Sequence, residues 1–245
     1  REKLMNDITT IGVIGLGNAG TPILNNLNQT NKYKLVAFDI DTKKLNDVPD
    51  NVFKATSVKD IAEQSNLVLT CLPKPEHVLE VVDGKDGLLQ NSSKDMVWID
   101  TSTTNFKQTQ KLAIKASTHG VSMLEATLTG GVHALQNNNM VCLAGGDEDT
   151  FKLWKGVLQD AIGEVVVLCG KVGAGAIAKV VSNMLAFTNM VAASECRKIA
   201  KKAGVDLENF VDAIRVSAGN SFAWETVVPH IFNQKYESGF TMDLA

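Results

Sequence analysis

The sequence predicts an α/β protein in which a doubly wound, mostly parallel sheet is followed by an all-α domain. Short β-branched apolar runs alternate with segments of helical periodicity along roughly the first two thirds of the chain. A glycine-rich turn joins the first apolar run to the first helical segment, and the strand pattern stops after Gly170. Together these observations predict a sheet covered by helices and then a separate helical domain.

The strands are predicted from apolar runs whose length suits buried strands. They are residues 8–16, 34–39, 66–72, 96–101, 121–126, 140–144 and 164–169. The segments between these runs have the character of surface helices, and Pro22 falls in a first helical turn, where proline is tolerated. The predicted helices are residues 19–30, 42–47, 58–64, 75–91 with a glycine-containing turn, 106–118 and 149–160.

Two further helices, residues 174–203 and 206–217, are predicted after the last strand. Gly204 favours a helix C-cap, which ends the first of them. The predicted domains are therefore a sheet domain at residues 8–169 and a helical domain at residues 170–245.

The long helix of the second domain is apolar but contains Lys179, Asn183 and other polar side chains. These groups would be costly in lipid. We therefore predict a buried helix of a soluble protein and not a membrane span.

Composition excludes several classes of protein. The 245 residues carry 24 Lys and Arg against 27 Asp and Glu, and this net charge of −3 disfavours a nucleic-acid binder. With 44% hydrophobic and 21% charged residues, the chain is an ordinary globular protein and not a disordered one. The four cysteines and four histidines lack metal-ligand spacing, so no metal is expected. The first ten residues lack the apolar core of a signal peptide, which predicts the cytoplasm or another reducing compartment.

The glycine-rich turn has the pattern G-x-G-x-x-G between a predicted strand and a predicted helix. There the first glycine permits the tight turn, the second lets the backbone approach a pyrophosphate, and the third allows close packing of helix on strand. The helix N-terminus offers N–H groups and a partial positive charge to the phosphates. The turn therefore predicts a Rossmann-type domain, with an unliganded glycine turn as the alternative. The expected cofactor contacts are Gly15, Leu16, Gly17, Asn18, Ala19 and Gly20.

Asp39 lies 19 residues beyond Gly20, at the end of the second predicted strand. An acidic residue at about this separation binds the ribose hydroxyls of NAD, and its charge repels the 2′-phosphate of NADP. Ile40 follows at a place where an arginine would favour NADP. Lys43 and Lys44 could reach a 2′-phosphate, but we interpret them as solvated helix surface. The sequence therefore predicts NAD, with NADP as the alternative.

A lysine inside an apolar helix needs a reason, because burying an ammonium group is costly. Lys179 holds such a place, and Asn183 lies one turn later on the same helix face. Burial would lower the pKa of Lys179 towards neutrality, as a general acid and base requires, and the Asn183 amide could orient a substrate. The alternative is a lysine that extends its charged group into water from the helix surface.

Two polar segments follow predicted strands. Thr129 precedes Gly130 and Gly131, and this turn could hold a carboxylate through backbone N–H groups and the threonine hydroxyl. A plain turn is the alternative. Residues 100–103 bring hydroxyl groups to the carboxyl edge of the sheet, where ligands of such sheets bind, although they could instead cap the next helix.

Five motifs, in order, resemble those of the β-hydroxyacid dehydrogenase family, the group of 3-hydroxyisobutyrate dehydrogenase and tartronate semialdehyde reductase. GLGNAG at residues 15–20 resembles the family's GLGxMG, and CLP at 71–73 resembles its strand-end LP. DTSTTN at 100–105 resembles D-x-S-T-x-P, and EATLTGG at 125–131 resembles DAPVSGG. GAGAIAKVVSN at 173–183 resembles GxGxxxKxxNN. The resemblance covers nearly the whole chain.

The resemblance implies a role for each matched residue. Lys179 would be the general acid and base, and Asn183 would orient the substrate. Trp224 belongs to an aromatic segment that would close the site. The implied substrate-binding residues are Ser102, Thr129, Gly130, Gly131 and Trp224. The residues implied to line the cofactor are Leu72, Pro73, Ser102 and Thr103.

Several residues depart from the family pattern. Asn105 and Thr127 stand where the family has proline, and Thr129 replaces a serine but keeps a hydroxyl. Ser182 stands where related 6-phosphogluconate dehydrogenases have histidine, which argues against their substrate. The final GFTMDLA resembles the segment before the family's K-D-L motif, so the helical domain is expected to be incomplete at its carboxyl end.

The sequence thus predicts an oxidoreductase that transfers a hydride between a nicotinamide cofactor and a small β-hydroxy acid, of the 3-hydroxyisobutyrate or the tartronate semialdehyde/glycerate type. A homo-oligomer is expected, and neither nucleic acid nor membrane is an expected partner. A non-catalytic nucleotide-binding or scaffold protein with the same fold is the alternative, and the presence of Lys179 favours the enzyme. An imine reductase is less favoured, because those enzymes usually replace this lysine.

Overall fold

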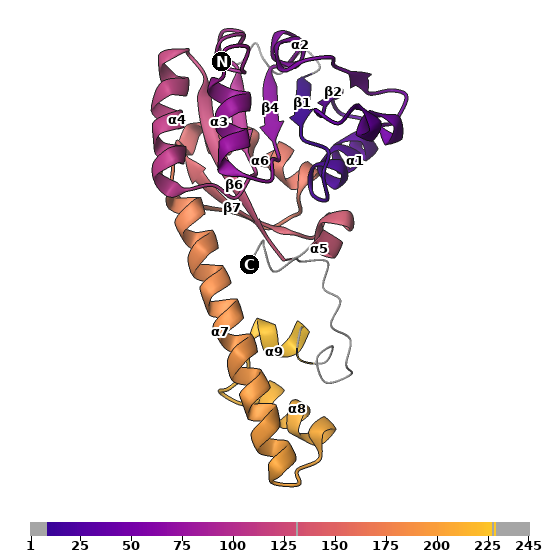
Figure 1. Ribbon diagram of the computed structural model, residues 1–245, viewed down its shortest axis with the longest axis vertical. Coiled ribbons are helices and arrows are strands. Elements are labelled where there is room, and N and C mark those ends of the chain that lie inside the picture. The colour runs from indigo at the N-terminus through magenta and orange to yellow at the C-terminus, as the bar shows by residue number, and fades with distance from the viewer. Residues whose placement is uncertain (1–8, 131, 227, 229–245) are drawn as a thin grey trace. The chain divides into compact units, whose positions relative to one another are not determined.

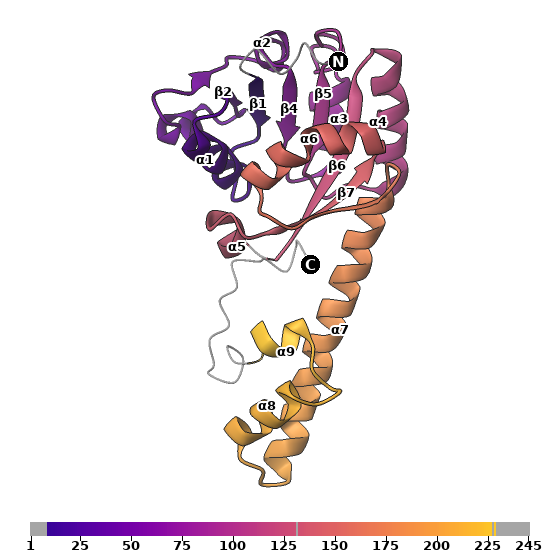
Figure 2. The same cartoon turned by 180° about the vertical axis from the view of Figure 1, so that it is seen from behind.

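The computed structural model describes residues 9–130, 132–226 and 228. The chain divides into two compact units, residues 1–179 and 180–245, which we describe separately. The described part of the first unit forms an eight-stranded sheet of order β3-β2-β1-β4-β5-β6-β7-β8 (Figures 1 and 2). The strands are β1 (Thr10–Ile14), β2 (Lys34–Phe38), β3 (Phe53–Lys54), β4 (Leu67–Thr70), β5 (Val97–Asp100), β6 (Ser122–Thr129), β7 (Val141–Gly146) and β8 (Val166–Gly170).

Every strand pair is parallel except β6 with β7, so the prediction of a doubly wound, mostly parallel sheet is confirmed. Two details of the sheet differ from the sequence prediction. β3 was not expected, because it has only two residues and pairs only with β2. β6 continues to Thr129, because its antiparallel ladder with β7 extends to the pair of Thr129 with Val141. Thr129 is therefore the last residue of a strand.

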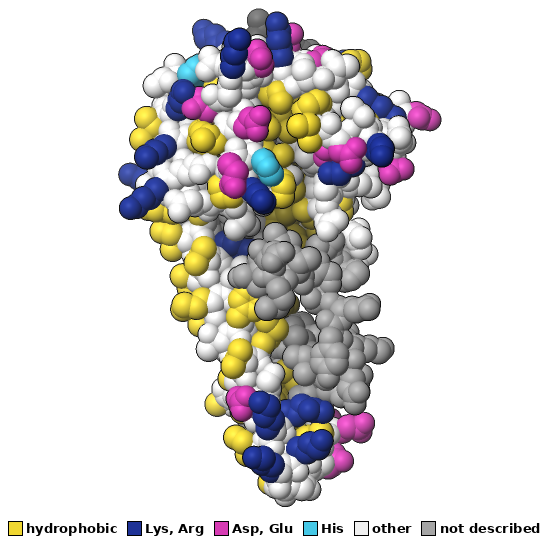
Figure 3. Space-filling view, in the orientation of Figure 1, with side chains coloured by type: hydrophobic (Ala, Val, Ile, Leu, Met, Phe, Trp, Pro, Cys, Tyr) yellow, Lys and Arg dark blue, Asp and Glu magenta, His cyan; other side chains and the backbone are white. Residues whose placement is uncertain are grey.

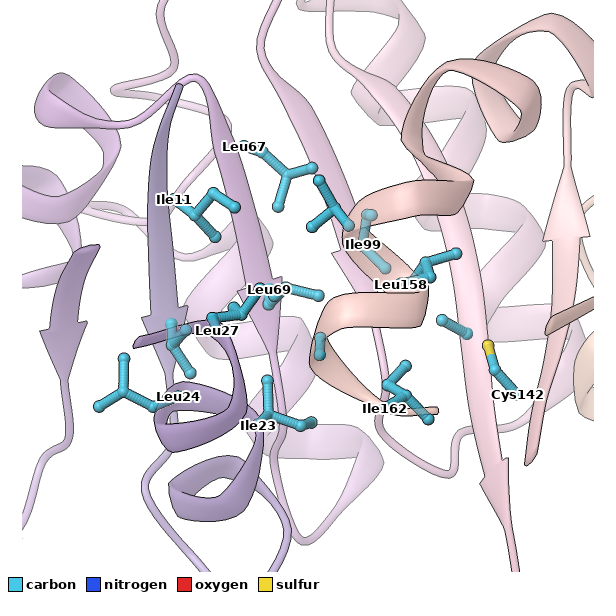
Figure 4. Close-up of a cluster of buried hydrophobic side chains, with 14 of the residues drawn as sticks. Ile11, Ile23, Leu24, Leu27, Leu67, Leu69, Ile99, Cys142, Leu158 and Ile162 are labelled. Atoms are coloured by element: carbon cyan, nitrogen blue, oxygen red, sulfur yellow. The ribbon is translucent and has the colours of Figure 1, made fainter. Parts of the chain in front are cut away.

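Helices cover both faces of this sheet. One apolar cluster joins α1 and α6 to the sheet, with Leu27 of α1 and Leu158 of α6 packing near Ile11 and Ile99 (Figure 4). A second cluster joins α2, α3 and α4 to the other face, around the fully buried Trp98. The helices of the first unit are α1 (Gly20–Thr30), the 3-10 helix η2 (Thr42–Asp47), α2 (Val58–Gln64), α3 (Pro75–Asp83), α4 (Phe106–Thr118), α5 (Val132–Gln136) and α6 (Glu148–Ala161).

Helix α3 ends at Asp83, where the predicted glycine-containing turn begins. Gly84 is its C-cap, and its N–H group donates to the Glu80 carbonyl at 3.0 Å. A Cβ at Gly87 would come within 2.8 Å of the Gly84 nitrogen. The two glycines therefore turn the chain at the end of α3.

The register of the sheet brings polar residues to the carboxyl ends of neighbouring strands. Thr70 of β4 pairs with Ile14 of β1 and with Asp100 of β5. Asp100 in turn pairs with Glu125 of β6, and both carboxyl groups are 2% exposed. Ligands of open α/β sheets bind outside these strand ends.

Helix α7 (Ala174–Lys202) begins in the first unit and is followed by α8 (Leu207–Arg215) and α9 (Phe222–Thr226). In the second unit, Trp224 packs edge-on against Phe210, with ring centroids 5.8 Å apart, in a small core with Ala193 and Val211. This confirms that helices follow the sheet.

The prediction that α7 is buried is wrong for the single chain. Only 11% of its most apolar 18-residue stretch is buried, and Val180 and Val191 are 61% and 66% exposed. Figure 3 shows hydrophobic side chains along this helix. Among the described residues, α7 alone is long and apolar enough to cross a membrane, a test that helices of soluble proteins also pass. Apolar composition predicted burial here, but the described residues leave much of the helix exposed.

Candidate active site

The first and third glycines of the turn after β1 are required by packing. Gly15 has φ +94°, and a Cβ there would overlap the Cys71 carbonyl oxygen at the end of β4. A Cβ at Gly20 would overlap the Gly15 carbonyl oxygen. These two residues therefore hold β1, β4 and the start of α1 together, as the motif predicts for a tight turn and for helix packing.

Gly17 differs from its two neighbours in the motif. It is exposed, and no atom lies within 4 Å of the position where its Cβ would stand. It borders a cleft of about 630 Å³ that is also lined by Leu16, Asn18, Thr21 and Lys44. The N-cap residue of α1 makes no side-chain hydrogen bond, and the first turn contains no acidic residue. This open, uncapped helix N-terminus fits the phosphates of a dinucleotide.

The Asp39 side chain is hydrogen-bonded to the glycine-rich turn. The side chain is 5% exposed, and its Oδ2 atom accepts the Leu16 N–H group at 2.7 Å. Lys44 Nζ lies 3.2 Å from the same oxygen. Lys44 is exposed on η2, as our interpretation of it as solvated helix surface expects, but its ammonium group also contacts Asp39. A carboxylate and an ammonium group stand together here, which leaves both NAD and NADP chemically admissible.

The loops after β4 and β5 are tied to each other. Ser102 Oγ accepts the Leu72 N–H group at 3.0 Å, and Asp100 Oδ1 accepts the Ser102 N–H group at 3.0 Å. The structure thus brings together Leu72 and Ser102, while Pro73 and Thr103 are exposed beside them. Burial raises the pKa of Asp100 to about 6, although hydrogen bonds from Ser102 and Thr70 oppose the rise.

Residues 100–103 do not cap the next helix, so this alternative role is wrong. Asn105 is the N-cap of α4, and its side chain accepts the Lys107 N–H group at 2.9 Å. Asn105 stands where the resembled family has proline. Asparagine is among the best N-cap residues, so this departure has a local structural reason.

Strand β6 and helix α7 are joined by two side chains from the same face of the strand. Glu125 accepts N–H groups from Gly173 at 2.5 Å, from Gly175 at 2.9 Å and from Ala176 at 3.2 Å. Thr127 Oγ1 lies 3.2 Å from the Gly175 carbonyl oxygen. Sequence analysis assigned no function to Glu125. The signal that could have found it is a single charged residue inside a strand that has no other charged side chain.

This contact also lies next to a predicted substrate-binding residue and the predicted catalytic residues. Thr129 follows Thr127 by one strand repeat, and Lys179 follows Gly175 by one helical turn. Both therefore lie immediately beyond the contact between β6 and α7. Lys179 is half-buried, and burial lowers its pKa. Asn183 follows one turn later on the same helix.

The remaining predicted substrate residues differ in how the structure places them. Gly130 is exposed with φ +130°, a conformation that favours glycine, and Gly131 lies outside the described residues. Trp224 is 4% exposed in the core of the second unit, where its Nε1 atom donates to the Val211 carbonyl at 3.2 Å. Within the described part of the chain, no group of three His, Cys, Asp or Glu side chains could hold a metal ion.

Two family models match the chain. The model of the NAD binding domain of 6-phosphogluconate dehydrogenase matches residues 10–170. The model for the NAD-binding segment of NADP-dependent 3-hydroxyisobutyrate dehydrogenase matches residues 173–245. Together they span the sheet and the helical segment.

Similar proteins carry related names. The mitochondrial 3-hydroxyisobutyrate dehydrogenase of Mus musculus is 30% identical over 98% of this chain and 73% of its own length. That of Homo sapiens is 30% identical over 95% and 71%. The solved structure of Mycobacterium tuberculosis 3-hydroxyisobutyrate dehydrogenase with L-serine has a TM-score of 0.88 at 27% identity, and the match covers 97% of this chain and 83% of that one.

Proposed function

Because this chain belongs to the β-hydroxyacid dehydrogenase family and is an NAD(P)-dependent hydroxyacid dehydrogenase, we propose that it oxidises a small β-hydroxy acid with Lys179 as general acid and base. The proposed substrates are of the 3-hydroxyisobutyrate or the glycerate/tartronate semialdehyde type. The observation that supports the proposal is the contact of α7 with β6, since half-buried Lys179 and Thr129 both follow this contact along their own elements.

The residues of this chain have distinct tasks in the proposed reaction. In oxidation, neutral Lys179 accepts the substrate hydroxyl proton at Nζ, and in reduction the protonated form returns a proton to the carbonyl oxygen. Burial lowers the pKa of Lys179, which increases its neutral fraction. The Thr129 hydroxyl and the backbone of the following glycines hold the carboxylate, and the Asn183 amide orients the hydroxyl. When bound, the nicotinamide supplies the hydride acceptor.

We propose NAD as the preferred cofactor. The turn at residues 15–20 and the N-terminus of α1 would hold its phosphates, and Asp39 its ribose hydroxyls. The place of the Asp39 carboxylate beside the glycine-rich turn supports this choice, and so does the 92% exposed Ile40 that follows, which offers no charge to a 2′-phosphate. Lys44 keeps NADP as the second cofactor to test.

The proposal extends to a reducing compartment and a homo-oligomer. Cys71, Cys142, Cys169 and Cys196 are free thiols, which supports the first. The exposed apolar side chains of α7, such as Val180 and Val191, support the second, because a second copy could cover them.

The test is absorbance at the reduced-nicotinamide band while the purified chain meets 3-hydroxyisobutyrate, glycerate, 3-hydroxypropionate and serine, each with NAD and then NADP. Serine is included because a related structure is described with it. We expect turnover with at least one acid and a lower KM for NAD than for NADP. Tight cofactor binding without turnover of any member would instead favour the non-catalytic nucleotide-binding protein. A lower KM for NADP would overturn the cofactor choice alone.

A further inference from the structure

We infer that Glu125 is a positioning residue for Lys179: its buried carboxylate binds the N-terminus of α7 and sets where the lysine lies relative to β6. The inference rests on the proposed role of Lys179 as the general acid and base. Glu125 is 2% exposed, and both of its carboxylate oxygens accept backbone N–H groups. It acts through the first turn of the helix that carries the lysine.

The carboxylate is satisfied entirely by helix N-terminal donors among the contacts of the described residues. Oε1 accepts from Gly173 at 2.5 Å and Gly175 at 2.9 Å, and Oε2 accepts from Ala176 at 3.2 Å. The first N–H groups of a helix have no partner within the helix, and the helix dipole favours a negative charge there. Burial raises the pKa of Glu125, and these three donors oppose the rise.

Two glycines make room for this carboxylate, and a third is required by the backbone conformation beside it. A Cβ at Gly145 of β7 would overlap Glu125 Oε1. A Cβ at Gly175 would stand 2.7 Å from the Leu143 carbonyl oxygen and 3.2 Å from Glu125 Cδ. Gly173 has φ +102°, a conformation that other residues rarely adopt. Sheet and helix are therefore both shaped around the side chain.

The anchoring of α7 differs from that of other helices in this chain. The N-termini of α2, α6 and α8 are capped by Ser57, Asp147 and Asp206, each the residue directly before its helix. Such a local cap stabilises a helix wherever the helix lies. Glu125 is 48 to 51 residues away from its three partners, so it fixes the helix to a particular point of the central sheet.

That point matters because Lys179 lies one turn beyond Gly175. A displacement of the helix start passes to Lys179 directly, since a single helical turn is rigid. A misplacement of a catalytic group by about 1 Å can cost roughly 10²-fold in rate. The proposed general base therefore depends on the buried Glu125 carboxylate.

The test compares Glu125→Gln and Gly145→Ala with wild type. Glu125→Gln keeps the volume but directs an amide N–H group at N–H donors. Gly145→Ala keeps the carboxylate but displaces it. Gly156→Ala is the matched control, because nothing lies within 4 Å of a Cβ at that position of α6. For each variant, cofactor-binding stoichiometry counts the folded sites, and kcat is expressed per site.

We expect kcat per cofactor-binding site to fall at least ~10-fold in both variants, with the Kd of the cofactor changed less than about threefold. The control should keep wild-type values. A merely structural role would reduce the number of sites but leave kcat per site unchanged, and that result would overturn the inference. If Glu125→Gln fails to fold, Gly145→Ala decides by the same criterion.

Backbone amide hydrogen exchange separates this inference from the proposed function. In Glu125→Gln, or in Gly145→Ala where the first variant does not fold, exchange at residues 173–176 should become faster, while exchange at residues 15–24 stays as in wild type. If the wild type oxidises no member of the panel, the proposed function fails, but the exchange experiment still measures the anchoring. Unchanged exchange at residues 173–176 would overturn the inference whatever the enzyme turns over.

Discussion

The N-terminus of α1 is open, whereas the N-terminus of α7 is filled. No side chain caps α1, its first turn has no acidic residue, and Gly17 leaves space in front of it. At α7, the Glu125 carboxylate accepts the N–H group of Gly173, directly before the helix, and those of Gly175 and Ala176 in its first turn. The two helices follow strands of one sheet, and both begin after glycine-containing turns.

The two helix N-termini show that the same feature can either bind a ligand or anchor a helix. Free N–H groups and the dipole at a helix N-terminus attract an anion. Where the chain supplies no anion, the site fits the phosphates of a cofactor. Where it supplies its own carboxylate, the helix is held in place and no anion can bind. A glycine-rich helix start is therefore a ligand site only when no acidic side chain of the protein occupies it.

The largest effect should come from the side chain that the filled terminus positions. Lys179→Ala should reduce kcat at least ~10²-fold, because the variant has no group at that place to exchange the substrate proton. In wild type, oxidation should accelerate as pH rises through the lowered pKa of Lys179, and the variant should lose this dependence. The measurement is kcat for oxidation as a function of pH.

The matched control is Lys171→Ala, which removes an exposed lysine just before α7 and should leave kcat unchanged. A loss of only a few-fold in Lys179→Ala would contradict the acid and base role. Glu125 would then still anchor α7, but this anchoring would no longer position a catalytic group.

The open N-terminus of α1 is tested by substituting two glycines of the turn that precedes it. Gly17→Ala should raise the cofactor Kd by about 10-fold, because its Cβ points into space that the pyrophosphate would use, while the free energy of unfolding stays within about 0.5 kcal/mol. Gly15→Ala should lower the free energy of unfolding by about 2 kcal/mol or more, because φ is +94° and the Cβ overlaps the Cys71 carbonyl oxygen.

Cofactor titration and urea unfolding of both variants separate the two roles. An unchanged cofactor Kd in a folded Gly17→Ala protein would show that the open helix end does not bind phosphates. A fully stable Gly15→Ala protein would contradict the close approach of β1 and β4 that this structure has.

The smallest effect concerns Asp100, a buried carboxyl group whose hydrogen bonds come from Thr70 and Ser102 and not from a helix N-terminus. Burial raises its pKa to about 6 from 3.8, so the folded state binds this proton more tightly than the unfolded state. Its contribution to stability is complete below the unfolded pKa and is lost as pH rises through about 6. Asp100→Asn removes this dependence, and Oδ1 of asparagine can keep the hydrogen bonds from Thr70 and Ser102.

Urea unfolding at pH 5 and pH 8 measures the change. From the lower to the higher pH, the stability of Asp100→Asn relative to wild type should rise by about 1 kcal/mol. Asp86→Asn, at an exposed position, is the matched control. A relative stability of Asp100→Asn that falls with pH would reverse the assigned sign.

Local patterns in the sequence determined the order of the elements and the glycine-rich turn. The strand–turn–helix at residues 8–30 was predicted because periodicity and turn stereochemistry act over a few neighbouring residues. The importance of Lys179 was also visible, since a charge inside an apolar helix is conspicuous in one dimension. Its role as general acid and base stays a prediction.

Tertiary structure decided which of these features face one another. Glu125 meets Gly173 only because β6 and α7 pack together across 48 residues, and Lys44 meets Asp39 only because η2 turns back over the end of β2. The family resemblance implies a substrate role for Trp224, which stays a prediction, whereas only the tertiary structure shows its ring in the core of the second unit. Contacts of this kind depend on packing between distant elements, where burial and hydrogen-bond geometry select the partners, and no local pattern records that choice.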